Sequence, residues 1–300
     1  MGYGSLPVVI RFSPTSRPRH ERTHAERLAS RDGYFPPESV IRRIGNSALT
    51  PFLGGGAAVL LQVAHPLVAA GVVEHSDYRD DLWRRLVRTL RALYLITYGT
   101  EAEADQAGEA VRRGHARVRG VTTEALGPFP AGTPYSATDP GLMLWVHATL
   151  VHVSLQLYQR HVRRLQPVEE ERYYREMAIV AQIFGTPAAV IPPSLGEFRE
   201  YLAAQIDEGP ITVTTPARNV ASVILAAPLP APMRVLGPAH RLATAGTLPP
   251  RLQQEYGLPW SPARRVAFHV AARAVRVTTT PVLAAASHLR LPPRLLSANG

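Results

Sequence analysis

The fold is decided by residues 139–164, DPGLMLWVHATLVHVSLQLYQRHVRR, a nearly unbroken apolar stretch near the middle of the chain. Asp139 is a favourable N-cap, and Pro140 suits the first helical position. From Leu142 to Leu157 the apolar side chains run almost all round the predicted helix, which lacks the polar stripe of a surface helix. This stretch therefore predicts a central, buried helix.

Segments with helical periodicity lie on both sides of that stretch. Pro66 is expected to break the first of them, Gly99 to end the second and Thr100 to cap the third. The predicted helices cover residues 51–73, 78–98, 100–118, 168–184, 194–208, 216–225 and 263–278, and a short strand is possible at 210–214. The sequence thus predicts an all-α, multi-helix single domain at residues 36–280, with an N-terminal arm (1–35) and a C-terminal tail (281–300).

Composition excludes several classes of site. The 300 residues, of which 46% are apolar, are enough for a substantial core. There is no cysteine, which excludes disulfides, thiolate-bound zinc, cysteine-held iron–sulfur clusters and cysteine nucleophiles. All 33 basic residues are arginines that are scattered among acids, so the formal charge of +10 does not indicate nucleic-acid binding.

The sequence predicts a cytoplasmic protein without a membrane span. The first twelve residues lack the pattern of a secretory signal. The most apolar stretch, residues 57–73, is short for a span and contains Gln62, His65 and Pro66. The segment after residue 280 is rich in proline and carries Arg290 and Arg294, so it could be a tail, a partner contact or a peripheral membrane contact.

Arg85 and Thr89 break the pattern of the second predicted helix. They fall one turn apart on the face of Leu82, Leu86 and later apolar residues. A guanidinium on an apolar face needs an anionic partner. That partner is either a structural carboxylate (Asp77, Asp80 or Asp81) or an anionic ligand, and structural ion pairs are the commoner case.

The third predicted helix has a face of small side chains that leads to His115. The face comprises Ala104, Ala107, Gly108, Val111, His115 and Val118. Small residues before a histidine allow a flat body such as a haem to approach, and histidine is the usual proximal haem ligand in helical pockets. The alternative is a close helix–helix contact with His115 hydrogen-bonded in the core.

Other histidines offer weaker sites. His147 and His152 lie five residues apart on the central helix, too far round it for an i, i+4 metal pair, and are expected to be hydrogen-bonded core histidines. His65, Glu74, His75 and Asp77 could form a non-haem metal site of imidazoles and carboxylates. The sequence has no nucleophile elbow, zinc-protease helix or kinase motif, so any chemistry must come from a cofactor or a metal.

Several strings together resemble the family of MpaB-type oxygenases and rubber oxygenases of the latex-clearing type. The likeness spans about residues 35–260. The strings are GGGAAVLLQVAHP (54–66), VVEHSDY (72–78), RLVRT (85–89), YGT (98–100), HARVRG (115–120), PYSA (134–137), LWVHAT (144–149), ERYY (171–174) and LPW (258–260).

The resemblance implies an all-helical fold with a globin-like core, a b-type haem and dioxygen as co-substrate. Characterised family members cleave carbon–carbon double bonds of isoprenoid chains. By position, His115 matches the family's proximal haem ligand and thus becomes the expected iron ligand. Arg85 and Thr89 would act beside the haem, with Val111 and Gly108 against it. His147 is the alternative ligand if His115 faces solvent.

One residue departs from the rubber-cleaving branch. That branch has a lysine just before the threonine, whereas this chain has Arg88 there and no lysine anywhere. A lysine-capped iron is therefore not expected, and a soluble isoprenoid or lipid fits better than rubber, an insoluble extracellular polymer that would need an exported enzyme. The resulting hypothesis is a haem b-dependent oxygenase acting on a hydrophobic alkene. The alternatives are a non-haem metal enzyme and a helical protein that binds haem or lipid without turnover.

Overall fold

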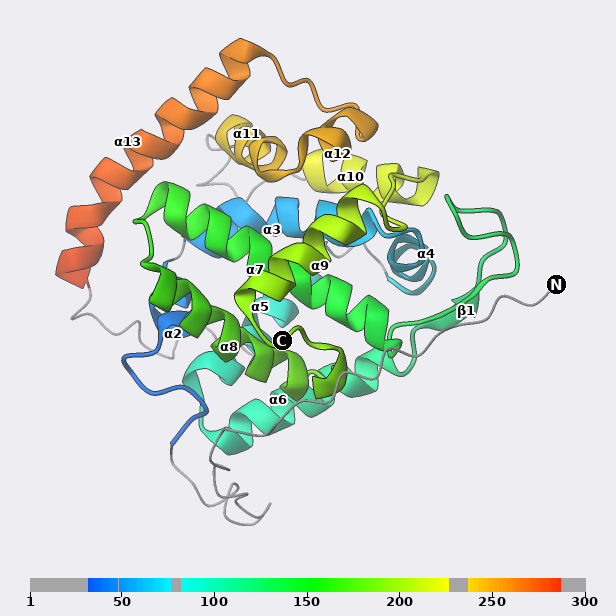
Figure 1. Cartoon of the computed structure of the whole chain (residues 1–300), viewed down its shortest axis with the longest axis horizontal. Coiled ribbons are helices and arrows are strands. Elements are labelled where there is room, and N and C mark those ends of the chain that lie inside the picture. The colour runs from blue at the N-terminus through cyan, green and yellow to red at the C-terminus, as the bar shows by residue number, and fades with distance from the viewer. Residues whose placement is uncertain (1–31, 48, 77–81, 227–236, 287–300) are drawn as a thin grey trace.

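The computed structural model describes residues 32–47, 49–76, 82–226 and 237–286 (Figure 1). The described part is helical apart from one small β-hairpin, which confirms the predicted all-α class. The first helices are α2 (Val40–Gly45), α3 (Leu49–Val63), α4 (Pro66–His75), α5 (Leu82–Tyr98), α6 (Glu101–His115), α7 (Pro140–His161) and α8 (Pro167–Ile183). The later ones are η1 (Ala188–Val190), α9 (Leu195–Asp207), α10 (Thr215–Ala226), α11 (Gly237–Thr247), α12 (Pro250–Glu255) and α13 (Pro262–Ala286).

Helix α7 is the central helix, as predicted. Asp139 accepts hydrogen bonds from the backbone N–H groups of Gly141 and Leu142 at its start. Helices α3, α8, α11 and α13 pack around it (Figure 1). Trp145 is completely buried, and its Nε1 donates to the carbonyl of Gln62 on α3 at 3.1 Å. The apolar side chains on all faces of α7 are thus covered by several neighbouring helices.

The triple glycine of α3 allows this helix to fit between α7 and α11. A Cβ on Gly54 would lie 2.6 Å from Cδ1 of Leu157, closer than side-chain atoms approach. A Cβ on Gly56 would lie 2.5 Å from Oγ1 of Thr244 on α11. The glycines therefore serve helix packing rather than phosphate binding.

The helix break predicted at Pro66 is present. Helices α3 and α4 meet at an angle of 108°. His65 caps α4, since its Nδ1 accepts from the N–H of Leu67 at 3.3 Å, and Pro66 takes the first helical position. Among the described residues no single helix meets the length and hydropathy needed to cross a bilayer, whereas this bent pair meets them when it is taken together.

Helices α5 and α6 form a helical hairpin around Gly99. Thr100 caps α6 in a capping box with Glu103, as the sequence predicts. Helix α6 ends at His115 and not near residue 118. The reason is that strand β1 (Arg119–Val121) follows and pairs antiparallel with β2 (Pro134–Ser136).

The strand suggested at residues 210–214 is wrong. Ile211 and Val213 are buried, which explains their alternation with polar neighbours. No strand lies beside them in the described structure: the N–H of Thr212 donates to the carbonyl of Ala64, and that of Val213 to the carboxylate of Glu255. This segment is thus extended but is held by a loop and a side chain.

The ends of the domain differ from the predicted boundaries. Phe35 is buried and the hydroxyl of Tyr34 donates to Asp105, so the last residues assigned to the arm pack on the domain. Helix α13 runs through residue 280 to Ala286. The rest of the predicted arm (1–31) and tail (287–300) lies outside the described residues.

Candidate functional site

The predicted iron ligand lies where three elements meet. His115 is the last residue of α6, and it is half-buried with its Nδ1 shielded from solvent. Its carbonyl accepts from the N–H of Val118 at 3.0 Å. Val118 Cγ1 would lie 3.3 Å from a Cβ on Gly71, so the turn that follows α6 approaches α4 closely at this point. His115 thus begins a turn that packs against the C-terminal half of α4.

A polar cluster lies at the end of α4. The hydroxyl of Tyr135 on β2 donates to Glu74 and lies 3.2 Å from Nε2 of His75. The rings of His75 and Tyr135 meet edge to face, with centroids 6.1 Å apart. Burial and the neighbouring Glu74 raise the pKa of Tyr135, so its proton stays on the hydroxyl and the residue acts as a donor.

We call this region the hairpin corner and define it by six residues: Gly71, Glu74, His75, His115, Val118 and Tyr135. It lies beside the β-hairpin that leads into α7 (Figure 1). Sequence reasoning singled out His115, Glu74 and His75 but did not assign a role to Tyr135. The contact of Tyr135 with Glu74 joins residues that are far apart in the sequence. It depends on the register of the hairpin, which the local sequence does not reveal.

Gly108 serves a close helix–helix contact. A Cβ on this residue would lie 2.5 Å from Cγ2 of Ile183 and 2.7 Å from its carbonyl oxygen. The small face of α6 is thus filled at this level by the end of α8. The structure therefore shows at Gly108 the packing role that the sequence left open as an alternative.

Arg112 is a residue that sequence reasoning missed. Its guanidinium donates to the carbonyl of Ile183 and, through Nε and Nη2, to Glu109 at 3.0 and 2.7 Å. Both Arg112 and Met143 of α7 approach Gly185, which has a positive φ of 100°. Arg112 thus ties α6 to the end of α8 one turn before His115.

The two predicted residues on α5 are placed differently. Thr89 is exposed, as are its neighbours Val87 and Arg88. The face is buried only further along, at Ile96 and Thr97. For Arg85 the structure gives the position on α5, at the end away from the Gly99 turn, but its side chain and Asp77, Asp80 and Asp81 lie outside the described residues.

The two histidines of α7 differ from each other. His152 lies 2.8 Å from the side-chain amide of Gln156, as expected for a hydrogen-bonded core histidine. For His147 the same expectation is wrong: both ring nitrogens are buried and neither has a hydrogen-bond partner among the described residues. Burial lowers the pKa of His147 to about 4, so its imidazole is neutral at pH 7.

The residues proposed for a non-haem metal do not come together. His65 precedes the first residue of α4, whereas Glu74 and His75 end this helix, so the two groups lie about 15 Å apart along its axis. His65 already uses Nδ1 as a cap, and burial lowers its pKa to about 4. Within the described ranges no three His, Asp or Glu residues form a metal-binding group, and Asp77 lies outside those ranges.

Comparison with known proteins identifies the family. A family model described as "ER-bound oxygenase mpaB/B'/Rubber oxygenase, catalytic domain" matches residues 42–277. Searches of curated proteins and of solved structures gave no match. The match covers more than half of the chain and includes α3 to α12 completely. It supports an oxidoreductase that uses dioxygen and a small-molecule substrate. The chain therefore belongs to the family of mpaB and rubber oxygenase catalytic domains.

Proposed function

We propose that this oxygenase is haem b-dependent and that it acts on a hydrophobic alkene of isoprenoid or lipid type. The single observation that carries the proposal is the position of His115, half-buried at the end of α6, in the turn that places Val118 next to Gly71 and near Tyr135. Haem, when bound, supplies the activation of dioxygen, and the protein supplies the ligand and the surroundings.

Two histidines are candidates for the iron ligand. A ligating imidazole must be neutral and must offer a ring nitrogen. His147 satisfies both conditions, since it is neutral and its two nitrogens are without hydrogen-bond partners in the described structure. We favour His115 because the turn that follows it packs against the hairpin corner, and because it matches the family's proximal haem ligand by position. His147 remains the alternative.

The remaining residues of the corner would position groups and hold protons. Tyr135 keeps its proton and donates to Glu74, so it fixes the carboxylate at the end of α4. His75, whose Nε2 lies 3.2 Å from the same hydroxyl, would help to hold Tyr135 in place. Arg112 ties α6 to Ile183 and so limits the movement of the turn that carries His115. Exposed Arg88 stands where the latex-clearing branch has its lysine, so a soluble isoprenoid or lipid is a better candidate substrate than rubber.

The test compares three histidine variants of the full chain. His115→Ala should lose most of its haem, measured from the visible spectrum and a pyridine extract, while the helical circular dichroism is kept. His152→Ala, at a half-buried histidine of α7 that contacts Gln156, is the matched control and should retain haem. Haem loss in His147→Ala with retention in His115→Ala would transfer the ligand role to His147.

Turnover is tested separately from haem binding. The haem-loaded protein should consume dioxygen when isoprenoid alkenes are added, and the products should be carbonyl compounds detectable by mass spectrometry. Haem-loaded protein that is inert across the alkene panel would support a binding protein instead. Purified protein that contains iron without porphyrin absorbance would contradict the haem proposal as a whole.

A further inference from the structure

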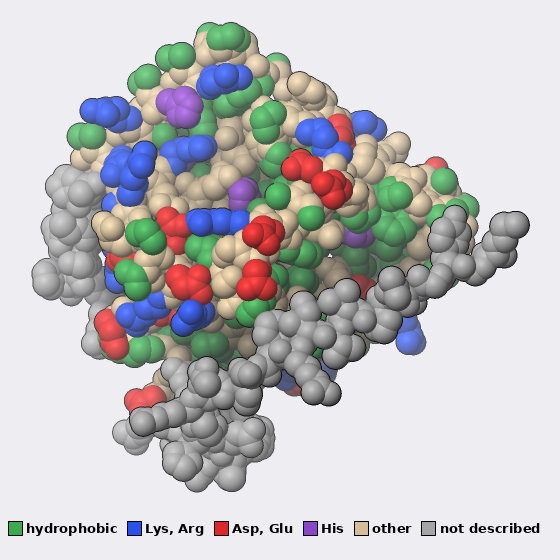
Figure 2. Space-filling model, in the orientation of Figure 1, with side chains coloured by type: hydrophobic (Ala, Val, Ile, Leu, Met, Phe, Trp, Pro, Cys, Tyr) green, Lys and Arg blue, Asp and Glu red, His purple; other side chains and the backbone are tan. Residues whose placement is uncertain are grey.

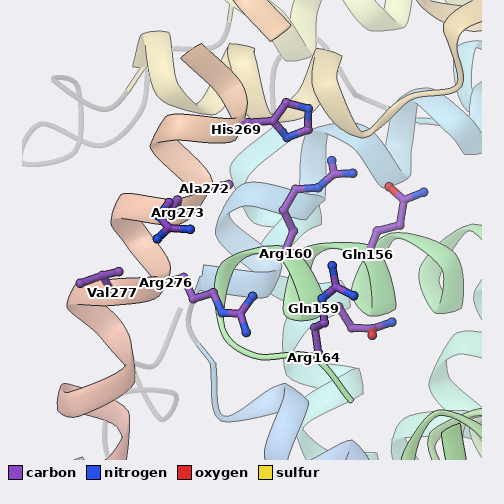
Figure 3. Close-up of a pocket in the computed structure, with 9 residues that line it drawn as sticks. All are labelled: Gln156, Gln159, Arg160, Arg164, His269, Ala272, Arg273, Arg276 and Val277. Carbon is purple, nitrogen blue, oxygen red and sulfur yellow. The ribbon is translucent and has the colours of Figure 1, made fainter. Parts of the chain in front are cut away.

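A second candidate site lies at the other end of α7, outside the region discussed so far. A hollow of about 960 Å³, open to solvent, lies beside the contact between the C-terminal part of α7 and α13 (Figure 3). We call it the arginine groove. Its lining residues are Gln156, Gln159, Arg160, Arg164, His269, Ala272, Arg273, Arg276 and Val277.

The charge of the arginine groove is of one sign. Arg160 and Arg164 come from the α7 side, Arg273 lines the groove on α13, and Arg276 extends from α13 toward the α7 side (Figure 3). None of the described residues that line the groove is acidic. The sequence continues this bias, since the last Asp or Glu in the chain is Glu255. Guanidinium groups gathered without carboxylates favour an anion, and phosphate oxygens match their fork of N–H donors.

One wall of the groove is held in place by packing. The guanidinium of Arg160 lies 4.7 Å from the ring centroid of Phe268 and donates to the carbonyl of Gly246 at 3.3 Å. Burial lowers the pKa of Arg160 from its usual value, yet the group stays charged at pH 7 because that usual value is so high. Phe268 and Ala272 are the buried residues of α13 at this point. The groove is therefore formed by ordered elements.

The outer surface of α13 is apolar beside the arginines. Val266, Val270 and Val277 are 62%, 62% and 66% exposed. At 100° per residue these valines fall within about 40° of one another, on the side of α13 opposite Phe268. We call Val266, Val270 and Val277 the valine crest. Arg273 lies between the valine crest and the groove, and Val277 belongs to both. Figure 2 shows basic and apolar side chains interspersed over α13.

We propose that the arginine groove and the valine crest of α13 form a docking surface for an anionic phospholipid bilayer. Headgroup phosphates would enter between the arginines, and Val266, Val270 and Val277 would contact the boundary between headgroups and acyl chains. The combination of cationic side chains with adjacent exposed apolar ones is the pattern of interfacial helices. A soluble phosphate alone would give the valines no role. The proposal does not depend on haem or on the reaction.

The experiment measures co-sedimentation of the full chain with two kinds of vesicle. One contains phosphatidylcholine alone, and the other contains equal parts of phosphatidylcholine and phosphatidylglycerol. Binding should require phosphatidylglycerol and weaken as salt is added, because the attraction is screened. Each arginine near an anionic surface contributes about five-fold in affinity, so Arg164→Gln with Arg273→Gln should weaken binding about twenty- to thirty-fold. Both residues are exposed, so folding should be retained.

Control variants distinguish a specific effect of the groove arginines on vesicle binding from a general effect of the protein's net charge. Arg113→Gln with Arg199→Gln removes the same formal charge from α6 and α9 and should leave vesicle binding nearly unchanged. Val266→Ser with Val270→Ser should weaken binding while all arginines are kept. Equal losses in both arginine pairs would overturn the groove assignment.

Two further outcomes would overturn the lipid assignment. Binding that shows no preference for phosphatidylglycerol would do so directly. The same applies if inorganic phosphate or a single-stranded oligonucleotide, added at matched ionic strength, binds the groove and displaces the protein from vesicles completely. Because vesicle binding needs no haem, a colourless protein that still binds would contradict the proposed function and leave the docking surface intact.

Discussion

The two ends of α7 present opposite kinds of polar surface. At the N-terminal end, Asp139 caps the helix and Tyr135 donates to Glu74, so polar groups find partners within the chain. At the C-terminal end, Arg160 and Arg164 line the arginine groove together with Arg273 and Arg276 of α13. The first end combines donors with acceptors, whereas the second gathers like charges.

This difference indicates how far each end of α7 depends on a molecule from outside the protein. Groups that are paired within the protein stay in position before a substrate arrives, which suits a site that must be organised in advance. Like charges repel one another, and an external anion relieves that repulsion. We therefore expect the hairpin corner to depend on packing and the arginine groove to depend on salt and partner.

The largest effect is expected from a substitution in the core around α7, because this core supports both ends of the helix. Trp145→Ala deletes a completely buried ring that also donates to Gln62. Loss of a buried Trp costs about 3–5 kcal/mol, so urea denaturation should show a loss of this size. Haem retention and vesicle binding should then fall together. Val168→Ala, at a residue that is 74% exposed, is the control and should change the unfolding free energy little.

A second variant should affect the hairpin corner alone. Gly108→Ala places a Cβ 2.5 Å from a side-chain methyl and 2.7 Å from the carbonyl oxygen of Ile183. Such overpacking costs about 1–3 kcal/mol and should displace α6, so haem affinity should fall while vesicle binding is kept. Gly114→Ala on the same helix meets no atom within 4 Å and should stabilise by up to about 1 kcal/mol. Equal effects of the two substitutions would contradict the packing role of Gly108.

The fold was largely predictable because helix signals are local. The N-caps Thr100 and Asp139, the break at Pro66 and the apolar side chains on all faces of α7 each depend on neighbouring residues, and the structure confirms them. The α-helices missed were α2, α11 and α12, and the 3₁₀ helix η1 was missed as well. Two of these have only six residues, which is too short for a periodic pattern, and α11 contains few large apolar side chains.

The candidate site was less predictable because it depends on contacts across the chain. The partner of Tyr135 is Glu74, 61 positions earlier, and no local pattern links the two. In the same way, Arg112 donates a hydrogen bond to the carbonyl of Ile183, which lies 71 positions later in the sequence. The arginine groove was also missed, since arginines scattered in sequence converge only when α13 packs on α7.

A third prediction concerns the buried histidine midway between the ends. His147→Leu in haem-free protein removes two buried nitrogens that lack hydrogen-bond partners in the described structure. Replacing unsatisfied polar groups should stabilise the fold by about 1–2 kcal/mol at pH 7, measured by urea denaturation. His152→Leu is the matched contrast, because it leaves Gln156 without its partner and should destabilise.

The same variants should change the pH dependence of stability. Burial lowers the pKa values of His147 and His152 to about 4, below the unfolded value of 6.5. Between these values the unfolded chain binds more protons, so stability is complete above pH 6.5 and is lost as the pH falls toward 4. Each histidine contributes a slope of up to about 1.4 kcal/mol per pH unit. Each Leu variant should therefore flatten this acid limb, and an unchanged limb would contradict the neutral, buried state.

The smallest expected effect tests the pairing within the hairpin corner. Tyr135→Phe keeps the ring that packs against His75 but removes the hydroxyl that donates to Glu74. Because the Glu74 side chain is 55% exposed, water can replace the lost donor, and the cost should be about 1 kcal/mol in urea denaturation. Tyr94→Phe on α5, which keeps its ring contact with Tyr98, is the control. If Glu74 is held for a substrate, Tyr135→Phe should lower dioxygen consumption far more than stability, whereas a purely structural hydroxyl would lower both in proportion.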